Sequence, residues 1–385
     1  YETANTYTVT LLATNSIGSD TKSASNYITA SAAPGFLSGW TDRKEHLITG
    51  ANIQNYQMRF VVWNTAGTDN GENVYLDGHV KPDFSDLRFT DDANNLLPYW
   101  IEQTSSTNAV VWVKMPLISS GGTYLYIYSD NASAVSASNG NAVFEFFEDF
   151  ESGSTSGWTV DSGVSFTAST DSSVQGSYSG KFVHPGGSTV TGIRKSLTGR
   201  TDGILEYSIR PVQTNKYHRM NLLSGLPTQT QGTWTAFTNF GQIAYQVSTW
   251  TNLMGYSPNT WYKVRIDAND LQKYDVSVNN QRLANDVPTR GSFTSYNTVC
   301  AYGYDGGTAY YDNIFIRKYV SSEPVHRSWG SEEILELAPI ANFTASPVSG
   351  RAPLTVQFND TSQHRPTSWT WNFGDSGTST LQNPI

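Results

Sequence analysis

The stretch Trp261-Tyr-Lys-Val-Arg-Ile-Asp267 alternates apolar and polar side chains, and Tyr311-Asp-Asn-Ile-Phe-Ile-Arg317 continues the pattern further along the chain. A period of two is typical of a β-strand that buries one face. Similar short runs lie between turn clusters rich in Gly, Ser and Asn, for example at Tyr56–Trp63, Ala109–Lys114, Thr123–Tyr128 and Tyr274–Val278. Short strands at regular spacing favour sandwiches. The sequence therefore predicts an all-β protein made of tandem β-sandwiches.

The composition agrees with this fold class and excludes several kinds of partner. The 385 residues include 22 Tyr, 17 Phe, 11 Trp and 32 Gly, which favour strands and tight turns. A net charge of −9 leaves no basic surface for phosphates, so we expect no nucleic-acid partner. Cys300 is the only cysteine and the six His are scattered, which argues against a disulfide framework or a zinc site. No apolar run is long enough to cross a bilayer, so we expect no direct membrane insertion.

Turn-rich and Pro/Gly-containing stretches divide the chain into five segments. We predict half a sandwich at residues 1–33, complete sandwiches at 34–145 and 146–320, a linker at 321–338, and a second half sandwich at 339–385. The chain opens without a Met or a signal peptide, which we interpret as a mature or excised stretch.

The two end segments share one resemblance. Pro339-Ile-Ala-Asn-Phe343 and Trp369-Thr-Trp-Asn-Phe-Gly-Asp375 resemble the first half of a polycystic kidney disease (PKD) repeat, and Tyr1-Glu-Thr-Ala-Asn-Thr-Tyr7 with Asn15-Ser-Ile-Gly-Ser-Asp20 resembles its second half. The family fold is an immunoglobulin-like sandwich. Each half has one apolar face that needs cover, so we predict that the halves pack together, either within one chain or, as we favour, between units head to tail. The expected junction residues are Tyr7, Val9, Leu11, Trp369, Trp371 and Phe373.

The middle of the chain carries two further resemblances. Residues 36–150 resemble the domain of unknown function 2341, through stretches such as Gly39-Trp-Thr-Asp-Arg-Lys44 and Pro98-Tyr-Trp-Ile-Glu102. Residues 144–319 resemble a concanavalin-like or laminin-G-like jelly roll, a fold found in lectins and in inert spacers. Such domains occur together in archaeal and bacterial surface proteins, which implies an extracellular location.

The acidic run Glu145-Phe-Phe-Glu-Asp-Phe-Glu151 lies on the expected first strand of the jelly roll. Similarity to carbohydrate-binding jelly rolls implies a structural calcium between Asp149 or Glu151 and Asp312, since calcium prefers oxygen ligands. The alternative is a group of solvated carboxylates at a sheet edge. The spacing of Glu145 and Asp149 does not match the acidic pattern of concanavalin-like glycosidases, so we expect no enzyme.

An aromatic group lies in a polar, loop-rich part of the jelly-roll segment. Trp234, Tyr245, Trp250 and Tyr256, with His218 nearby, have the composition of a face on which sugar rings stack. The alternative is that these large side chains fill the interior of the sandwich.

These observations predict an extracellular structural subunit or repeat unit of a cell-surface filament, joined head to tail through a shared PKD module. Glycosylation is expected at the sequons of Asn131, Asn342 and Asn359. The alternatives are a carbohydrate-binding adhesin that uses the jelly roll to hold a surface polysaccharide, and a non-catalytic accessory region of a glycosidase.

Overall fold

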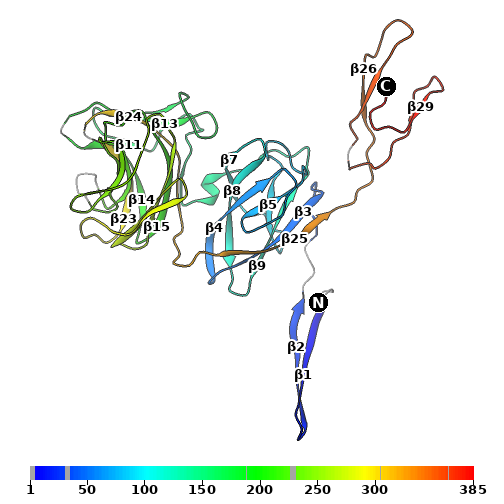
Figure 1. Cartoon of the computed structure of the whole chain (residues 1–385), viewed down its shortest axis with the longest axis horizontal. Helices are drawn as coiled ribbons and strands as arrows, with labels where there is room; N and C mark the ends of the chain where they lie inside the picture. Colours follow the sequence, from blue (N-terminus) through cyan, green and yellow to red (C-terminus); the bar gives the residue numbers. More distant parts are fainter. Residues whose placement is uncertain (1–4, 31–34, 188, 226–230, 304, 363) are drawn as a thin grey trace.

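A computed structural model describes residues 5–30, 35–187, 189–225, 231–303, 305–362 and 364–385. The PKD-like residues 1–4 and residues 31–33 of the first predicted segment lie outside the described residues. Nearly all regular structure among these residues is β, and they contain one short helix, α1 (Gly140–Val143), which confirms the predicted fold class (Figure 1). No helix in the described part of the chain is long and apolar enough to cross a membrane.

The first sandwich packs two four-stranded sheets against each other, in the orders β25-β3-β9-β6 and β5-β4-β8-β7. Phe60, Val62, Phe89, Val111 and Ile127 are among the buried side chains between the sheets. The strands are β3 (Asp42–Thr49), β4 (Ile53–Trp63), β5 (Asn73–Tyr75), β6 (Arg88–Asp91), β7 (Tyr99–Thr104), β8 (Asn108–Ile118), β9 (Thr123–Ser129) and β25 (Val325–Ile334).

The predicted linker at 321–338 is wrong over most of its length. Residues Val325–Ile334 form β25, which pairs antiparallel with β3 from Val325 opposite Thr49 to Ile334 opposite Asp42. The chain therefore leaves the first sandwich after β9, builds the second sandwich, and returns to complete the first. The second sandwich is an insertion in the first, not the next module in a row.

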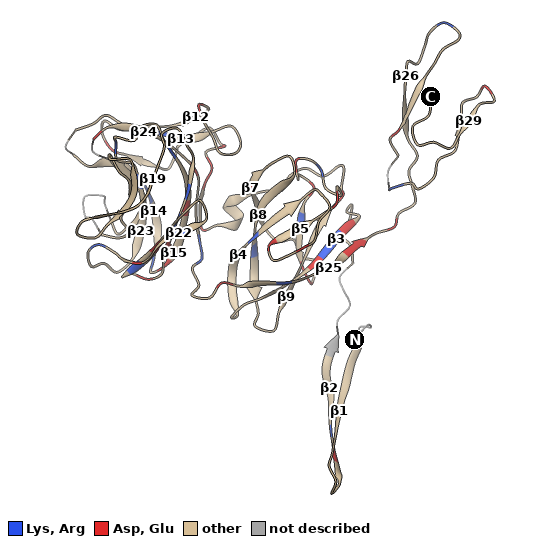
Figure 2. Ribbon diagram, viewed as in Figure 1, with Lys and Arg blue, Asp and Glu red and all other residues tan. Residues whose placement is uncertain are grey.

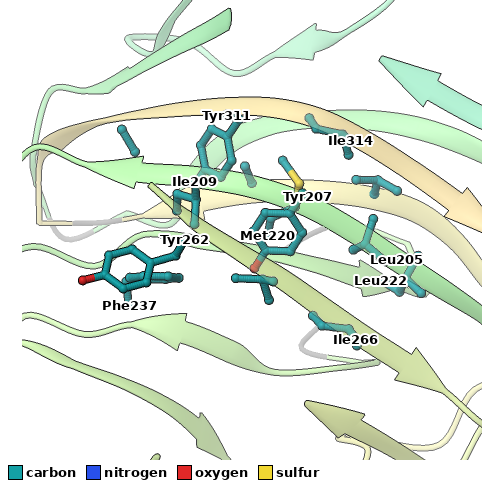
Figure 3. Packing of buried hydrophobic residues seen from close by; sticks show 14 of the residues in the cluster. Leu205, Tyr207, Ile209, Met220, Leu222, Phe237, Tyr262, Ile266, Tyr311 and Ile314 are labelled. Carbon is teal, nitrogen blue, oxygen red and sulfur yellow. The ribbon is translucent and has the colours of Figure 1, made fainter. Parts of the chain in front are cut away.

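The second sandwich has a large sheet in the order β12-β13-β24-β15-β20-β21-β22, with β10 also paired to β24, and a smaller sheet β11-β14-β23-β16. Side chains of β15, β16 and β24 fill the space between these sheets (Figure 3). The three-stranded sheet β17-β18-β19 completes this sandwich. Its strands are β10 (Phe146–Glu148), β11 (Thr159–Val160), β12 (Ser165–Ser169), β13 (Ser179–His184), β14 (Thr191–Arg200), β15 (Gly203–Pro211), β16 (Arg219–Leu223), β17 (Thr235–Phe237), β18 (Gln242–Gln246), β19 (Trp250–Gly255), β20 (Tyr262–Ala268), β21 (Lys273–Val278), β22 (Gln281–Pro288), β23 (Tyr296–Gly303) and β24 (Gly307–Arg317).

The terminal segments form separate small sheets that project from the first sandwich, near β3 and β25 (Figure 1). At the N-terminal end, β1 (Asn5–Thr14) and β2 (Ser19–Ala30) form a hairpin. At the C-terminal end, β26 (Phe343–Ser346) pairs with β27 (Gln357–Asp360), and β28 (Trp371–Asn372) pairs with β29 (Thr378–Ser379). The two ends lie apart in Figure 1, so this chain does not close its own ends into one module.

A buried aromatic cluster joins the two sandwiches. Phe315 on β24 stacks on Phe144 at a centroid distance of 4.3 Å and contacts the edges of Trp100 and Trp112 at 5.5 and 5.7 Å. Trp100 and Trp112 come from the first sandwich, on β7 and β8. All four rings are at most 5% exposed. This seam fixes the two sandwiches against each other, because separating them would expose all four rings to water.

Candidate functional site

A polar pocket of about 400 Å³ opens at the seam between the two sandwiches. This volume lies in the range of small-molecule sites, which occur preferentially at such interfaces. The first sandwich contributes side chains of β4 and β8, and the second those of β20 and β24 together with the return towards β25. The lining residues are Tyr56, Gln57, Met58, Arg59, Glu72, Trp112, Arg265, Asn280, Arg317, Glu323, Pro324 and His326.

Strand alternation places the charged lining of the pocket. On β15, Leu205 and Tyr207 point into the core of the second sandwich, so Glu206 points to the opposite face. Arg317 on β24 lies on that same face, and its Nε donates to Glu206 Oε1 at 2.8 Å. In an isolated sandwich this face would meet water, but the first sandwich covers it: Arg317 Nη1 donates to Tyr56 of β4 at 3.3 Å.

Buried charges of opposite sign, those of Glu206, Lys263 and Arg317, balance one another beneath the lining of the pocket. Burial by itself would raise the pKa of Glu206, but the charges of Lys263 and Arg317 outweigh it and lower the pKa to about 2. Arg317 Nη2 also donates to Glu323 at 3.2 Å, and Arg265 donates to the same carboxylate at 3.0 Å. Two guanidinium groups therefore converge on one half-exposed carboxylate at the pocket wall.

Arg59 and Tyr56 present polar groups to the open side of the pocket. Arg59 on β4 pairs with Glu72, and its side chain is 28% exposed, so solvent reaches this guanidinium more easily than the 3% exposed Arg317. Burial raises the pKa of Tyr56 to about 12, which keeps its hydroxyl protonated near neutral pH. The pocket thus offers guanidinium donors, carboxylate acceptors and an aromatic wall at Trp112. Such a set suits a polar ligand with hydroxyl and carboxylate groups.

The predicted sugar-stacking face is not formed as expected. Trp234 is 5% exposed and lies against Arg219 and Arg290, whose guanidinium carbons are 5.4 and 4.3 Å from its ring. Tyr256 is 8% exposed and packs on Phe237 inside the core. The prediction of an exposed face is therefore wrong for these two residues. Their rings are buried instead, as the alternative expected.

The other members of that group differ in burial. Tyr245 and Trp250 are half-buried, and Trp250 stacks on Tyr217 at 5.7 Å. His218 is completely buried, and burial lowers its pKa to about 4. Only Tyr245 and Trp250 keep surface through which a ligand ring could make contact.

The carboxylates predicted to bind calcium lie near one another around the loop before β13. Glu151 accepts hydrogen bonds from the backbone N–H groups of Ser177 and Tyr178, and Asp312 accepts one from Val174. Burial, followed by the negative charges of Glu151 and Asp149, raises the pKa of Asp312 to about 7. Carboxylate oxygens are ligands that calcium prefers, but the oxygens of Asp149, Glu151 and Asp312 are not all within 4.8 Å of one another among the described residues.

The remaining predicted sites lie on the surface or on the terminal sheets. Asn342 and Asn359 are exposed and Asn131 is partly exposed, so glycosylation stays a prediction. At the expected junction, Leu11 is exposed while Tyr7, Val9, Trp369, Trp371 and Phe373 are half-buried within their own small sheets.

Sequence reasoning missed one group entirely. The ligand atoms of Asp42, His79 and Glu332 all lie within 4.8 Å of one another. These residues come from β3, a loop after β5 and β25, so no local spacing connects them. Only the pairing of β25 with β3 brings Glu332 close to the start of β3, and β25 was not predicted from the sequence.

Comparison with known proteins gives one family match. Residues 83–161 match the domain of unknown function DUF2341. The match overlaps the predicted region, residues 36–150, and extends past its end to residue 161. No curated protein matches the chain.

Several solved structures are similar to part of the chain. A sialidase matches 51% of this chain with 11% identity and a TM-score of 0.38, and this chain covers 20% of the sialidase. An endo-β-1,4-glucuronan lyase from the fungus Trichoderma reesei matches 46% with 13% identity and a TM-score of 0.36, over 96% of its own length. The carbohydrate-binding module CBM66 from Bacillus subtilis matches 42% with 11% identity and a TM-score of 0.32, also over 96% of its length.

Proposed function

We propose that the chain is a non-catalytic part of an extracellular surface protein and that it binds polysaccharide in the pocket at the seam of its two sandwiches. The observation that carries this proposal is the polar pocket of about 400 Å³ between two sandwiches that a buried aromatic cluster joins. A preformed pocket loses little conformational entropy when a ligand binds, which favours affinity.

The lining favours a sugar that carries a carboxylate. Arg59, Arg265 and Arg317 line the pocket with Glu72 and Glu323. Arg265 and Arg317 also pair with Asp267 and Glu206 behind the lining. A planar guanidinium binds a carboxylate through two parallel hydrogen bonds. Glu72 and Glu323 can accept hydrogen bonds from sugar hydroxyls, and Trp112 supplies an apolar wall. A uronate-containing polysaccharide uses all three kinds of group.

Titration of the full chain with oligogalacturonate and with a neutral glucan oligomer tests this proposal. Arg59→Gln removes a partly exposed guanidinium that makes no ion pair with Glu206 or Glu323, and we expect uronate affinity to fall roughly tenfold or more. Arg327→Gln is the matched control, since Arg327 lies outside the pocket and donates to Thr49. Equal affinity of both variants, or no binding of any uronate, would contradict the proposal.

A second candidate function is end-to-end assembly through the terminal segments. A groove of about 610 Å³ lies among apolar side chains of the C-terminal strands, including Phe343, Phe358, Trp371 and Phe373. The N-terminal hairpin exposes Leu11, Leu12 and Ile17 at 66%, 61% and 93%. We propose that the β1–β2 hairpin of a second copy covers this groove, as strand addition to a half sandwich.

Sedimentation of the full chain over a range of concentrations tests end-to-end assembly. We expect association that Trp371→Ser weakens, since the groove loses one of its two indole rings, whereas Trp250→Ser in the second sandwich should leave it unchanged. A protein that stays monomeric at high concentration, or association that survives Trp371→Ser, would refute this function.

Two further features belong to the same proposal. We propose a structural calcium held by Asp312 with Asp149 or Glu151, supported by the negative charge that Glu151 and Asp149 add around the buried Asp312. An extracellular location with glycosylation at Asn131, Asn342 and Asn359 fits the partial or full exposure of all three asparagines.

A further inference from the structure

We propose that Asp42, His79 and Glu332 form a zinc site that ties β25 and the loop after β5 to the start of β3. The site lies in the first sandwich, away from the polysaccharide pocket and from the proposed calcium carboxylates. It is therefore independent of the proposed function.

The three ligands come together because β25 returns to β3 after the whole second sandwich. Ile334 at the end of β25 lies opposite Asp42 at the start of β3, and Glu332, just after an irregularity in the register, contacts His79. His79 follows a tight turn in which its N–H donates to Leu76 at 2.7 Å. Acidic residues gather at this end of β3 and β25 (Figure 2).

The distances suit a small divalent cation. His79 Nδ1 is 2.9 Å from Glu332 Oε1 and 3.9 Å from Asp42 Oδ1. Zinc bonds of about 2.0–2.2 Å to nitrogen and oxygen place tetrahedral ligand atoms roughly 3.4 Å apart. The observed separations lie on either side of that value, so small side-chain rotations suffice to bind the ion.

Asp42 provides an independent observation. Its side chain is 0% exposed, and its Oδ1 has no hydrogen-bond partner among the described residues although it faces His79. The other oxygen, Oδ2, accepts from Thr41 and from Arg365. A buried carboxylate oxygen without a donor is costly, so a cation at this position would compensate it.

The surrounding charge and the ligand types favour a transition metal. Asp42, Glu332 and the nearby Asp130 outnumber Arg365, which pairs with both aspartates. An imidazole ligand suits zinc and other transition metals, whereas calcium and magnesium prefer oxygen alone. Three protein ligands leave a fourth position for water.

Zinc content of the full chain after incubation with zinc chloride and gel filtration tests this site. We expect one equivalent in the unaltered protein and roughly hundredfold weaker binding in His79→Ala and Glu332→Gln. Matched controls are His364→Ala and Glu336→Gln, which remove the same side-chain types outside the cluster. His79 is 32% exposed in its side chain, so its replacement should not unfold the sandwich.

Cobalt provides a second readout of the same site. Cobalt in this site should give the strong visible absorption of a four-coordinate complex, and excess calcium should leave that absorption unchanged. Failure to retain zinc, retention equal in His79→Ala, or loss in the His364→Ala control would each overturn the assignment.

Discussion

The two central sandwiches and the three terminal sheets contain the same kind of alternating strand, yet their side chains differ in burial. Between the sandwiches, Phe315 is completely buried and contacts rings from both. On the terminal sheets, Phe343 is 56% exposed and Leu381 is 66% exposed. Alternation is enough to make strands, but only a second apolar face removes them from water. The central pair therefore buries its apolar faces, whereas the terminal segments leave large apolar side chains exposed.

Replacement of one phenylalanine in each region tests this difference most strongly. Phe315→Ala should lower the free energy of unfolding of the central pair by about 3–5 kcal/mol, because it leaves a cavity among aromatic rings. Phe343→Ala should cost less than about 1 kcal/mol in the monomer, because the side chain is already exposed. Urea unfolding of both variants checks the two values, and equal losses would remove the distinction.

Removal of the buried cation at the seam should have a similarly large effect. Arg317→Met leaves Glu206 buried without its closest guanidinium, which we expect to cost about 3–5 kcal/mol in the same urea experiment. Arg327→Met on exposed β25 is the control, with an expected change within about 0.5 kcal/mol. If Arg317→Met unfolds at the same urea concentration as the unaltered protein, the seam does not couple the two sandwiches.

The pairing of β25 with β3 should depend on pH. Burial, then the charge of His326, lowers the pKa of His46 to about 3, and burial lowers that of His326 to about 4. The charge of Glu72 raises the pKa of His326, and the charge of Arg59 lowers it. Both imidazoles are therefore neutral in the fold, and the unfolded chain takes up protons first as the pH falls below about 6.5.

Stability from this histidine pair is fully present above pH 6.5 and is lost as the pH falls towards 4 and 3. This histidine pair should contribute on the order of 3 kcal/mol to the difference in stability between pH 7 and pH 5 in urea titrations. His326→Gln should remove part of this dependence, whereas His364→Ala should not. A slope that is identical in all three proteins would show that other groups cause it.

Calcium should have the smallest effect and should act on the second sandwich alone. Calcium at about 100 times its dissociation constant adds about 2.7 kcal/mol to a folded state that binds it. We expect chelation to lower the melting temperature of the unaltered protein, added calcium to restore it, and Asp312→Asn to show neither change. Calorimetry that shows no shift on chelation, or the same shift in Asp312→Asn, would refute the calcium site.

Local patterns predicted the strands but not which surfaces meet. The alternation in Trp261–Asp267 places Tyr262 and Val264 in the core, as the structure confirms. The same alternation suggests that Lys263 and Arg265 face water, whereas the first sandwich partly covers them at the seam. The polar composition around Glu332 concealed β25, whose partner strand lies far away in the sequence. The contacts that arise when one sandwich is inserted in another join residues far apart in the sequence, so no local sequence pattern predicts them.

Hydrogen exchange of the full chain with and without oligogalacturonate tests the central claim most directly, because it locates the ligand. We predict slower exchange in β4 and in residues 323–326 and no change in β17–β19, around the half-buried Trp250. Protection confined to β17–β19, or no protection anywhere at saturating ligand, would contradict a polysaccharide pocket at the seam.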